Sequence, residues 1–147
     1  MRSFPPAANA VRSFVVLLVH GTFFLSLAQA GLSSQELDRL IEKIIAAESS
    51  GRPWLAGDQG RSRGLMQIQR ANWQKFTSES WDRAFEPALN RAVGASIVKD
   101  IAKKYGTRAN QALIVYTYNT GKFCKGELPD WTKRHPNNVY RGIYNER

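Results

Sequence analysis

The feature that most constrains the fold of this chain is an apolar stripe that ends in an acid. Between residues 35 and 48, large apolar residues recur at spacings of three and four, which predicts a helix with one buried face: Leu37, Leu40, Ile41, Ile44 and Ile45. Glu48 continues this stripe four residues after Ile44, whereas the other acids of the segment fall outside it. The pattern therefore places one carboxyl group on the buried side of the helix.

The position of Glu48 also predicts its protonation state. Gly51 is expected to end the helix, which puts Glu48 in the last turn, where the helix dipole disfavours a negative charge. Burial acts in the same direction, so we expect a raised pKa and a protonated side chain, as a general acid requires. The alternative is a glutamate at a fraying helix end that faces solvent.

Five short motifs follow in order along the chain. They are ESSG at residues 48–51, GLMQI at 64–68, FEPALN at 85–90, YTYNTG at 116–121 and NVYR at 138–141. Together they resemble the catalytic domain of the soluble lytic transglycosylases, a branch of the lysozyme-like superfamily. The resemblance covers about residues 35–144. It implies a mainly α fold, formed by a single lysozyme-like domain with a substrate groove.

The same resemblance implies a reaction. Glu48 would protonate the bond between N-acetylmuramic acid and N-acetylglucosamine in peptidoglycan, and would then act as the base that helps the muramoyl C6 hydroxyl to attack C1. The product would be a 1,6-anhydro sugar, with no cofactor and no metal. The residues that would contact substrate or support the acid are Ser49, Met66, Gln67, Tyr118, Asn119 and Tyr140.

Each of these positions also has a purely structural interpretation. Ser49 could make a local helix bond, and Met66 could fill the core, which is the usual role of a methionine. Thr117 and Thr120 stand where the family usually has alanines, and Arg61 and Arg63 make the preceding loop more basic than usual. The four tryptophans include candidate sugar-stacking platforms, because indole faces pack well on sugar rings.

Asp58 is the best candidate for a second acid. Glycoside cleavage usually needs two carboxyl groups, but Asp58 lies in the sequence Gly57-Asp58-Gln59-Gly60, where aspartate commonly forms a turn. We favour the turn. A hydrolytic lysozyme that lets water attack is the nearest alternative function, and a non-catalytic glycan-binding protein is a more distant one.

Residues 1–30 are predicted to be a signal peptide, and residues 31–147 the catalytic domain. Arg2 and Arg12 precede an apolar stretch, and Ala28-Gln29-Ala30 matches a cleavage site. The alternative is a membrane anchor. We expect an exported monomer, periplasmic or secreted, that reaches the wall with help from a cell-envelope partner.

The distribution of basic residues and the content of cysteine and histidine argue against a nucleic-acid-binding protein, a disulfide-stabilised domain and a zinc protein. Cleavage would leave 19 basic and 12 acidic residues, a net charge of +7, which suits an anionic polymer. The basic residues are scattered and form no nucleic-acid-binding motif. Cys124 is the single cysteine and His135 the single histidine after residue 30, so the chain lacks a disulfide and the ligands of a zinc site.

The rest of the chain also predicts helices. One should run from about Leu65 to Phe76, one from Pro87 to Gly106, one from a Thr107 cap to about Tyr118 closed by Gly121, and a short one near residues 138–144. No convincing pair of strands is expected.

Overall fold

The computed structural model describes residues 32–125, 127–130, 140 and 143. The α-helices within these ranges are α1 (Ser34–Ser49), α2 (Arg70–Phe76), α3 (Pro87–Tyr105) and α4 (Gln111–Thr120). Short 3₁₀ helices are η1 (Asp58–Gly60), η2 (Trp81–Phe85) and η3 (Gly106–Arg108). A small antiparallel sheet contains β1 (Ala56–Gly57), β2 (Ser62–Arg63) and β3 (Ile68–Gln69), in that order. The predicted mainly α fold is confirmed.

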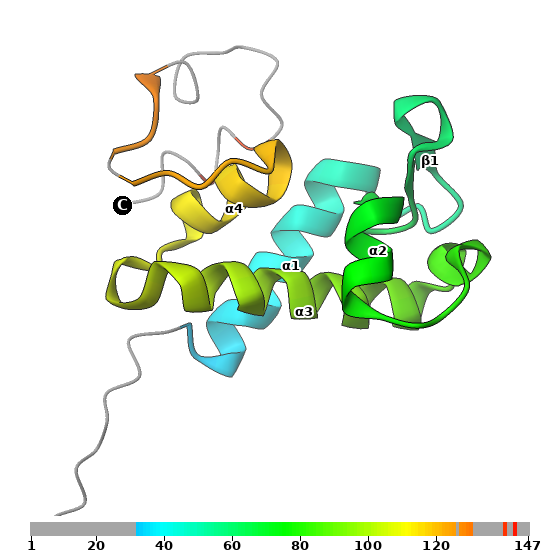
Figure 1. The fold of residues 1–147 in the computed structure, drawn as a ribbon, viewed down its shortest axis with the longest axis horizontal. Helices are drawn as coiled ribbons and strands as arrows, with labels where there is room; N and C mark the ends of the chain where they lie inside the picture. The colour runs from blue at the N-terminus through cyan, green and yellow to red at the C-terminus, as the bar shows by residue number, and fades with distance from the viewer. Residues whose placement is uncertain (1–31, 126, 131–139, 141–142, 144–147) are drawn as a thin grey trace, which may run out of the picture.

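Helix α3 is the centre of the described structure. It packs against α1, α2, α4 and η2, and α2 and α4 lie toward its opposite ends (Figure 1). The predicted stripe of α1 is buried in the core from Leu40 to Ile45, and Leu37 packs against the core from its edge. On α3, Val93, Ile97, Ile101 and Tyr105 are buried. Burial of these two apolar faces is the main stabilising contribution.

Both ends of α1 are fixed by specific contacts. Ser33 and Glu36 form a capping box, in which the Ser33 amide donates to Glu36 Oε2 at 2.8 Å. At the other end, Ser50 adopts the left-handed conformation with φ of 51°, one residue before the expected Gly51. The Arg52 side chain donates from Nε to the Ser49 carbonyl at 2.9 Å. Glu48 therefore lies in the last turn, as predicted.

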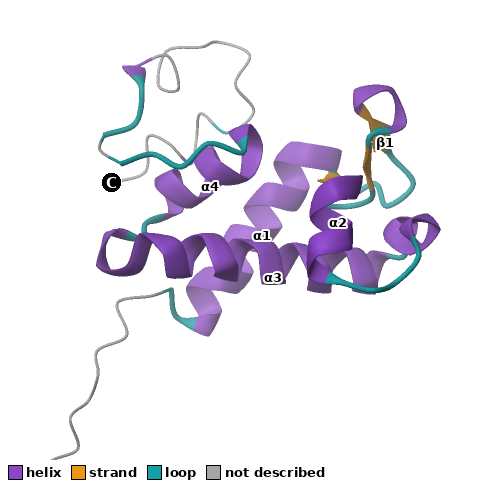
Figure 2. Cartoon of the chain, in the orientation of Figure 1, coloured by secondary structure: helices purple, strands orange, loops and turns teal. Residues whose placement is uncertain are grey.

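Two of the predicted boundaries are wrong. Helix α2 begins at Arg70 rather than near residue 65, because the preceding residues pair as strands, with Gly57 opposite Ser62 and Ser62 opposite Gln69. Figure 2 shows how short these strands are. Two-residue strands are too short to display an alternating pattern in sequence. Helix α4 is capped by Asn110, whose Oδ1 accepts from the Leu113 amide at 2.9 Å, and not by Thr107.

Asn90 joins the sheet to the helices. This side chain is fully buried on α3, and its Oδ1 accepts from the Met66 amide at 2.9 Å. Its Nδ2 donates to the carbonyls of Ala84 at 2.8 Å and Arg63 at 3.0 Å. Gly64 has a φ of 79°, and a Cβ there would lie 2.2 Å from the Ala84 carbonyl oxygen. Asn90 therefore fixes a loop that has no room for a side chain at Gly64.

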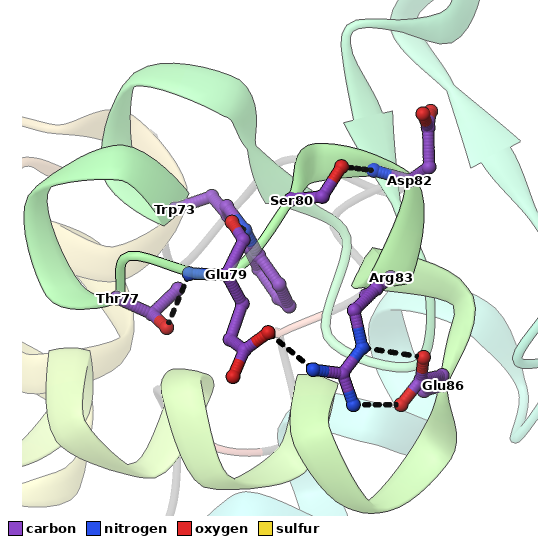
Figure 3. Close-up of polar contacts among 7 residues, drawn as sticks. All are labelled: Trp73, Thr77, Glu79, Ser80, Asp82, Arg83 and Glu86. Carbon is purple, nitrogen blue, oxygen red and sulfur yellow. Dashed lines mark hydrogen bonds and ion pairs between the residues drawn. The ribbon is translucent and has the colours of Figure 1, made fainter.

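The connection between α2 and α3 is held by a second polar cluster (Figure 3). The buried Trp73 donates from Nε1 to the Glu79 carbonyl at 2.8 Å. The Arg83 guanidinium contacts the carboxylates of Glu79 and Glu86, the latter at 2.7 and 2.8 Å. This cluster fixes the start of α3, the helix that carries Asn90.

No helix in the described ranges is long and apolar enough to cross a membrane. The predicted signal peptide lies outside the described residues, as does most of the predicted helix at residues 138–144, of which only Tyr140 and Ile143 are described.

Candidate active site

A cavity of about 170 Å³ opens at the C-terminal end of α1. Its walls come from α1, the hairpin of β1 and β2, the β3–α2 segment, α3 and the end of α4. Two of its lining residues are acids, Glu48 and Asp58. The other lining residues are Ser62, Gln67, Ile68, Gln69, Asn72, Ile97, Tyr118, Asn119, Thr120 and Gly121.

Glu48 is partly buried at the wall of this cavity. Burial is the largest cause of a raised pKa for its carboxyl group, and the nearby negative charge of Asp58 raises the pKa further. Tyr140 opposes this shift, because its hydroxyl donates a hydrogen bond to Glu48 Oε1 and so favours the carboxylate. The net direction is upward, as the sequence predicts. Glu48 therefore keeps its proton to a higher pH than an ordinary glutamate, as a general acid requires.

Tyr118 lies on the α4 side of the cavity. Its hydroxyl donates to the Met66 carbonyl at 2.7 Å, which ties α4 to the loop before β3. Burial, and then the charge of Glu48, hold the pKa of Tyr118 well above its usual value. The phenol therefore remains a neutral hydrogen-bond donor across the working pH range.

Gln67 lines the cavity, and its side-chain amide is hydrogen-bonded to neighbouring protein groups. Its Nε2 donates to the carbonyls of Leu55 and Gly64, both at 2.9 Å, and its Oε1 accepts from Ser62 Oγ at 3.1 Å. These contacts occupy both donors of the amide and one lone pair of its oxygen. The Gln67 backbone has a φ of 44°. The side chain fixes the hairpin against the loop and has little capacity left for a sugar.

The expectation that the Met66 side chain lines the groove is wrong. Met66 is fully buried, and its sulfur packs against α3 so closely that a Cβ at Gly94 would lie 2.1 Å from it. Its apolar side chain is more stable in the core than in contact with water. The contribution of Met66 to the site is its carbonyl, which accepts a hydrogen bond from Tyr118.

Ser49 and Asn119 differ in their access to the cavity. Ser49 is buried and is not part of the cavity lining. Its Oγ donates to the Ile45 carbonyl at 3.2 Å, which is the local helix bond considered above as the alternative to a contact with substrate. Asn119 is exposed and lines the cavity. Asn119 is therefore available to a ligand, whereas Ser49 is not.

The two threonines of the YTYNTG motif hold the chain that follows α4. Thr117 Oγ1 lies 2.7 Å from the Tyr105 hydroxyl and donates to the Lys122 carbonyl at 3.1 Å. Thr120 Oγ1 donates to the Tyr116 carbonyl at 2.7 Å and accepts from the Lys122 amide at 3.1 Å. Alanines could not make these bonds, so this chain fixes the rim of its cavity with hydroxyl groups.

Sequence reasoning missed several lining residues, namely Ser62, Gln69, Asn72 and Thr120. The first two lie on strands that the sequence does not reveal. Of the tryptophans, Trp73 is fully buried, Trp81 is partly buried against it, and Trp54 is 71% exposed. Trp131 lies outside the described residues. Trp54 is thus the described tryptophan that is open to a ligand.

Comparison with known proteins assigns the family. No curated protein and no solved structure matched the chain. A family model described as "Transglycosylase SLT domain" matches residues 26–139, which includes α1, the hairpin, α3 and α4. This is the family that the five sequence motifs resemble, and the match covers well over half of the chain. The protein therefore belongs to the transglycosylase SLT domain family.

Proposed function

We propose that this protein is a lytic transglycosylase that cleaves the β-1,4 bond between N-acetylmuramic acid and N-acetylglucosamine in peptidoglycan. Family membership supports the substrate class. The observation that carries the proposal is the environment of Glu48, a partly buried carboxyl group in a cavity, with a raised pKa and a hydrogen bond from Tyr140. This environment suits a group that first gives up a proton and then takes one back.

The reaction begins with the protonated Glu48. Its proton passes to the glycosidic oxygen, the bond from that oxygen to C1 of the muramoyl residue breaks, and the bonding electrons leave with the oxygen. The positive charge left at C1 is shared with the ring oxygen and with the acetamido oxygen of the same sugar. Glu48 is now a carboxylate, and the Tyr140 hydroxyl stabilises this form by its hydrogen bond.

In the second half, the C6 hydroxyl of the same muramoyl residue attacks C1 and transfers its proton to Glu48. A 1,6-anhydro bond forms, Glu48 regains its proton, and no water is consumed. The internal hydroxyl competes well with water because it is already bound, and a well-oriented internal group can reach an effective concentration of about 10⁵ M or more. No cofactor takes part in this sequence.

The decisive test of the acid is the Glu48→Gln variant. The amide nearly matches the carboxyl group in shape but cannot donate a proton, and one residue holds both the acid and the base role. We expect activity on purified peptidoglycan to fall by roughly 10²–10⁴-fold or more, with an unchanged circular dichroism spectrum. A folded variant that retains more than about a tenth of the activity would show that Glu48 is not the catalyst.

A hydrolytic lysozyme is the second candidate, and the position of Asp58 in the same cavity favours it. The two reactions differ in their products by one water molecule. Digestion in ¹⁸O-labelled water followed by mass analysis should yield unlabelled 1,6-anhydromuramoyl ends if the transglycosylase proposal is correct. Mainly labelled, reducing muramoyl ends would make the protein a hydrolase.

A further inference from the structure

The hairpin between β1 and β2 brings a second carboxylate to the cavity of Glu48. Asp58 follows β1 directly, is exposed to solvent and lines the same cavity as the catalytic acid. Its charge is close enough to Glu48 to raise the pKa of that group. The sequence suggests a turn residue here, and the structure shows that Asp58 is both a turn residue and part of the cavity wall.

The backbone at this position is unusual. Asp58 and Gln59 have φ values of 49° and 58°, and Gly60 follows with a φ of 85°. A left-handed conformation is unfavourable for a residue with a Cβ, although aspartate and asparagine tolerate it better than most residues do. Such strain persists only where the surrounding structure enforces it, and it is concentrated at functional sites.

The surrounding contacts enforce this conformation. The Asp58 carbonyl accepts from Arg61 twice, from the amide at 3.3 Å and from Nε at 3.0 Å. A Cβ at Gly57 would lie 2.3 Å from Gln67 Oε1, so the base of the hairpin lies directly on the Gln67 amide. The buried Ser62 hydroxyl lies between them, 3.1 Å from Gln67 Oε1 and 3.5 Å from Asp58 Oδ2.

The Asp58 carboxylate is therefore held in place mainly through its backbone. The single Ser62 hydroxyl proton can go either to Gln67 Oε1 at 3.1 Å or to Asp58 Oδ2 at 3.5 Å, and even the longer bond would occupy only one of about four acceptor positions on the two carboxylate oxygens. The negative charge of Asp58 can therefore interact with a ligand bound in the cavity.

We propose that Asp58 is a second functional carboxylate, whose negative charge stabilises the positive charge that develops on the muramoyl residue when Glu48 protonates the glycosidic bond. The inference rests on the proposed function above. Asp58 forms no bond to the sugar and exchanges no proton. It acts as a fixed charge that is already oriented before the reaction, the kind of group that contributes strongly to transition-state stabilisation.

A second effect follows for the acid itself. Three described groups that can carry charge face Glu48 from three segments: Tyr140 near the C-terminus, Tyr118 on α4 and Asp58 on the hairpin. Of these, Asp58 disfavours the carboxylate form of Glu48 by its negative charge, whereas the Tyr140 hydroxyl favours it. Removing either group should move the pH at which Glu48 loses its proton, in opposite directions.

The test compares Asp58→Asn with Asp100→Asn. Asparagine nearly matches aspartate in shape and tolerates the left-handed backbone, so the first variant removes the charge and keeps the hairpin. Asp100 pairs with Lys104 on α3 at 2.7 Å and is not part of the cavity lining, so its variant removes the same charge elsewhere. Initial rates on purified peptidoglycan are measured from acid to alkaline pH, together with the melting temperature of each variant.

We expect Asp58→Asn to lower the maximal rate by roughly 10–100-fold, with a melting temperature close to that of the parent. The high-pH limb of its rate profile should move to lower pH, because Glu48 loses its proton more readily without the Asp58 charge. Tyr140→Phe should move the same limb to higher pH. Asp100→Asn should match the parent protein in both rate and profile.

Two results would overturn the inference. One is an Asp58→Asn protein with the parent's rate and pH profile. The other is a loss of rate without movement of the high-pH limb, which would show that Asp58 acts only through the shape of the hairpin. Asp58→Gly provides a further comparison, because this variant removes both the backbone strain and the charge. If the charge is what matters, Asp58→Gly should be as slow as Asp58→Asn. The Glu48→Gln variant separately tests the proposed function, so the two failures can be distinguished.

Discussion

Glu48 is held between two opposing influences. Burial favours the protonated acid, and the hydrogen bond from Tyr140 favours the carboxylate. Under the proposed function, Glu48 spends part of each cycle in each of the two forms, so an environment that strongly favoured one form would slow one half of the reaction. The phenol also fixes the orientation of the carboxyl group while leaving its second oxygen free of that contact.

A raised pKa has a consequence for stability. The folded protein holds the Glu48 proton more tightly than the unfolded chain, in which the pKa is near its ordinary value of 4.5. The free energy of unfolding should therefore fall as pH rises from about 4.5 through the raised value. Glu48→Gln removes this loss, because its amide is never charged and its oxygen can still accept from Tyr140. We expect the variant to be more stable than the parent at neutral and alkaline pH.

Thermal unfolding measured at a series of pH values checks this expectation. The difference in melting temperature between variant and parent should be small at pH values below 4.5 and should grow as pH rises. A variant that is less stable than the parent at pH 8 would show that the carboxylate form of Glu48 is the favoured one.

The sequence predicted the burial of Glu48 and the direction of its pKa shift, because helical periodicity indicates which side chains of a helix are buried. It could not predict the environment of Asp58, because this residue is placed at the cavity by a hairpin whose strands are only two residues long. Met66 shows a different limit. The motif that contains it identifies the family, but only the fold shows that its side chain packs into the core and its carbonyl faces Tyr118.

At the scale of secondary-structure elements, Asn90 should be the most sensitive polar position outside the cavity. Replacing it with alanine removes the partner of the buried Met66 amide and Ala84 carbonyl, and also that of the partly buried Arg63 carbonyl. Each unsatisfied buried group costs about 1–3 kcal/mol, so we expect Asn90→Ala to lower the free energy of unfolding by about 3 kcal/mol or more. Urea denaturation measures this change.

Ser96→Ala is the matched control on the same helix. The Ser96 hydroxyl is exposed and bonds only locally, to the Ala92 carbonyl at 3.1 Å. Its loss should change stability by no more than about 0.5 kcal/mol. If the two variants were equally stable, the polar link between α3 and the GLMQI loop would not be what holds that loop in place.

The elements were predicted unevenly, for physical reasons. The helices were found because α1 and α3 carry long apolar faces, and the start of α3 because Pro87 suits the first helical turn. The start of α4 was misplaced because threonine and asparagine are both good caps, and only the intervening η3 selects Asn110. Strands without a hydrophobic pattern left no signal.

The molecule as a whole carries a formal net charge of +9 over the full chain. A positive surface attracts an anionic polymer, and this attraction is screened as the Debye length falls from about 10 Å at 0.1 M salt to about 3 Å at 1 M. We therefore expect the fraction of protein bound to purified cell walls to fall several-fold over that range. Sedimentation with insoluble walls measures it.

Under the proposed function, the Glu48→Gln protein suits this measurement, because it would leave the wall intact during the assay. Binding that does not change with salt would assign recognition to uncharged contacts such as those of Trp54, which is 71% exposed.

The hydrogen bond between Tyr140 and Glu48 joins residues that are 92 positions apart. During synthesis, the chain that ends in Glu48 is made long before the segment that carries Tyr140. Contacts between such distant residues also tend to form late in folding, because a long loop must close first. The acid therefore has its partner only after the segment that carries Tyr140 has been made. Under the proposed function, a nascent or truncated chain would contain every other part of the site and still be a poor wall-cleaving enzyme.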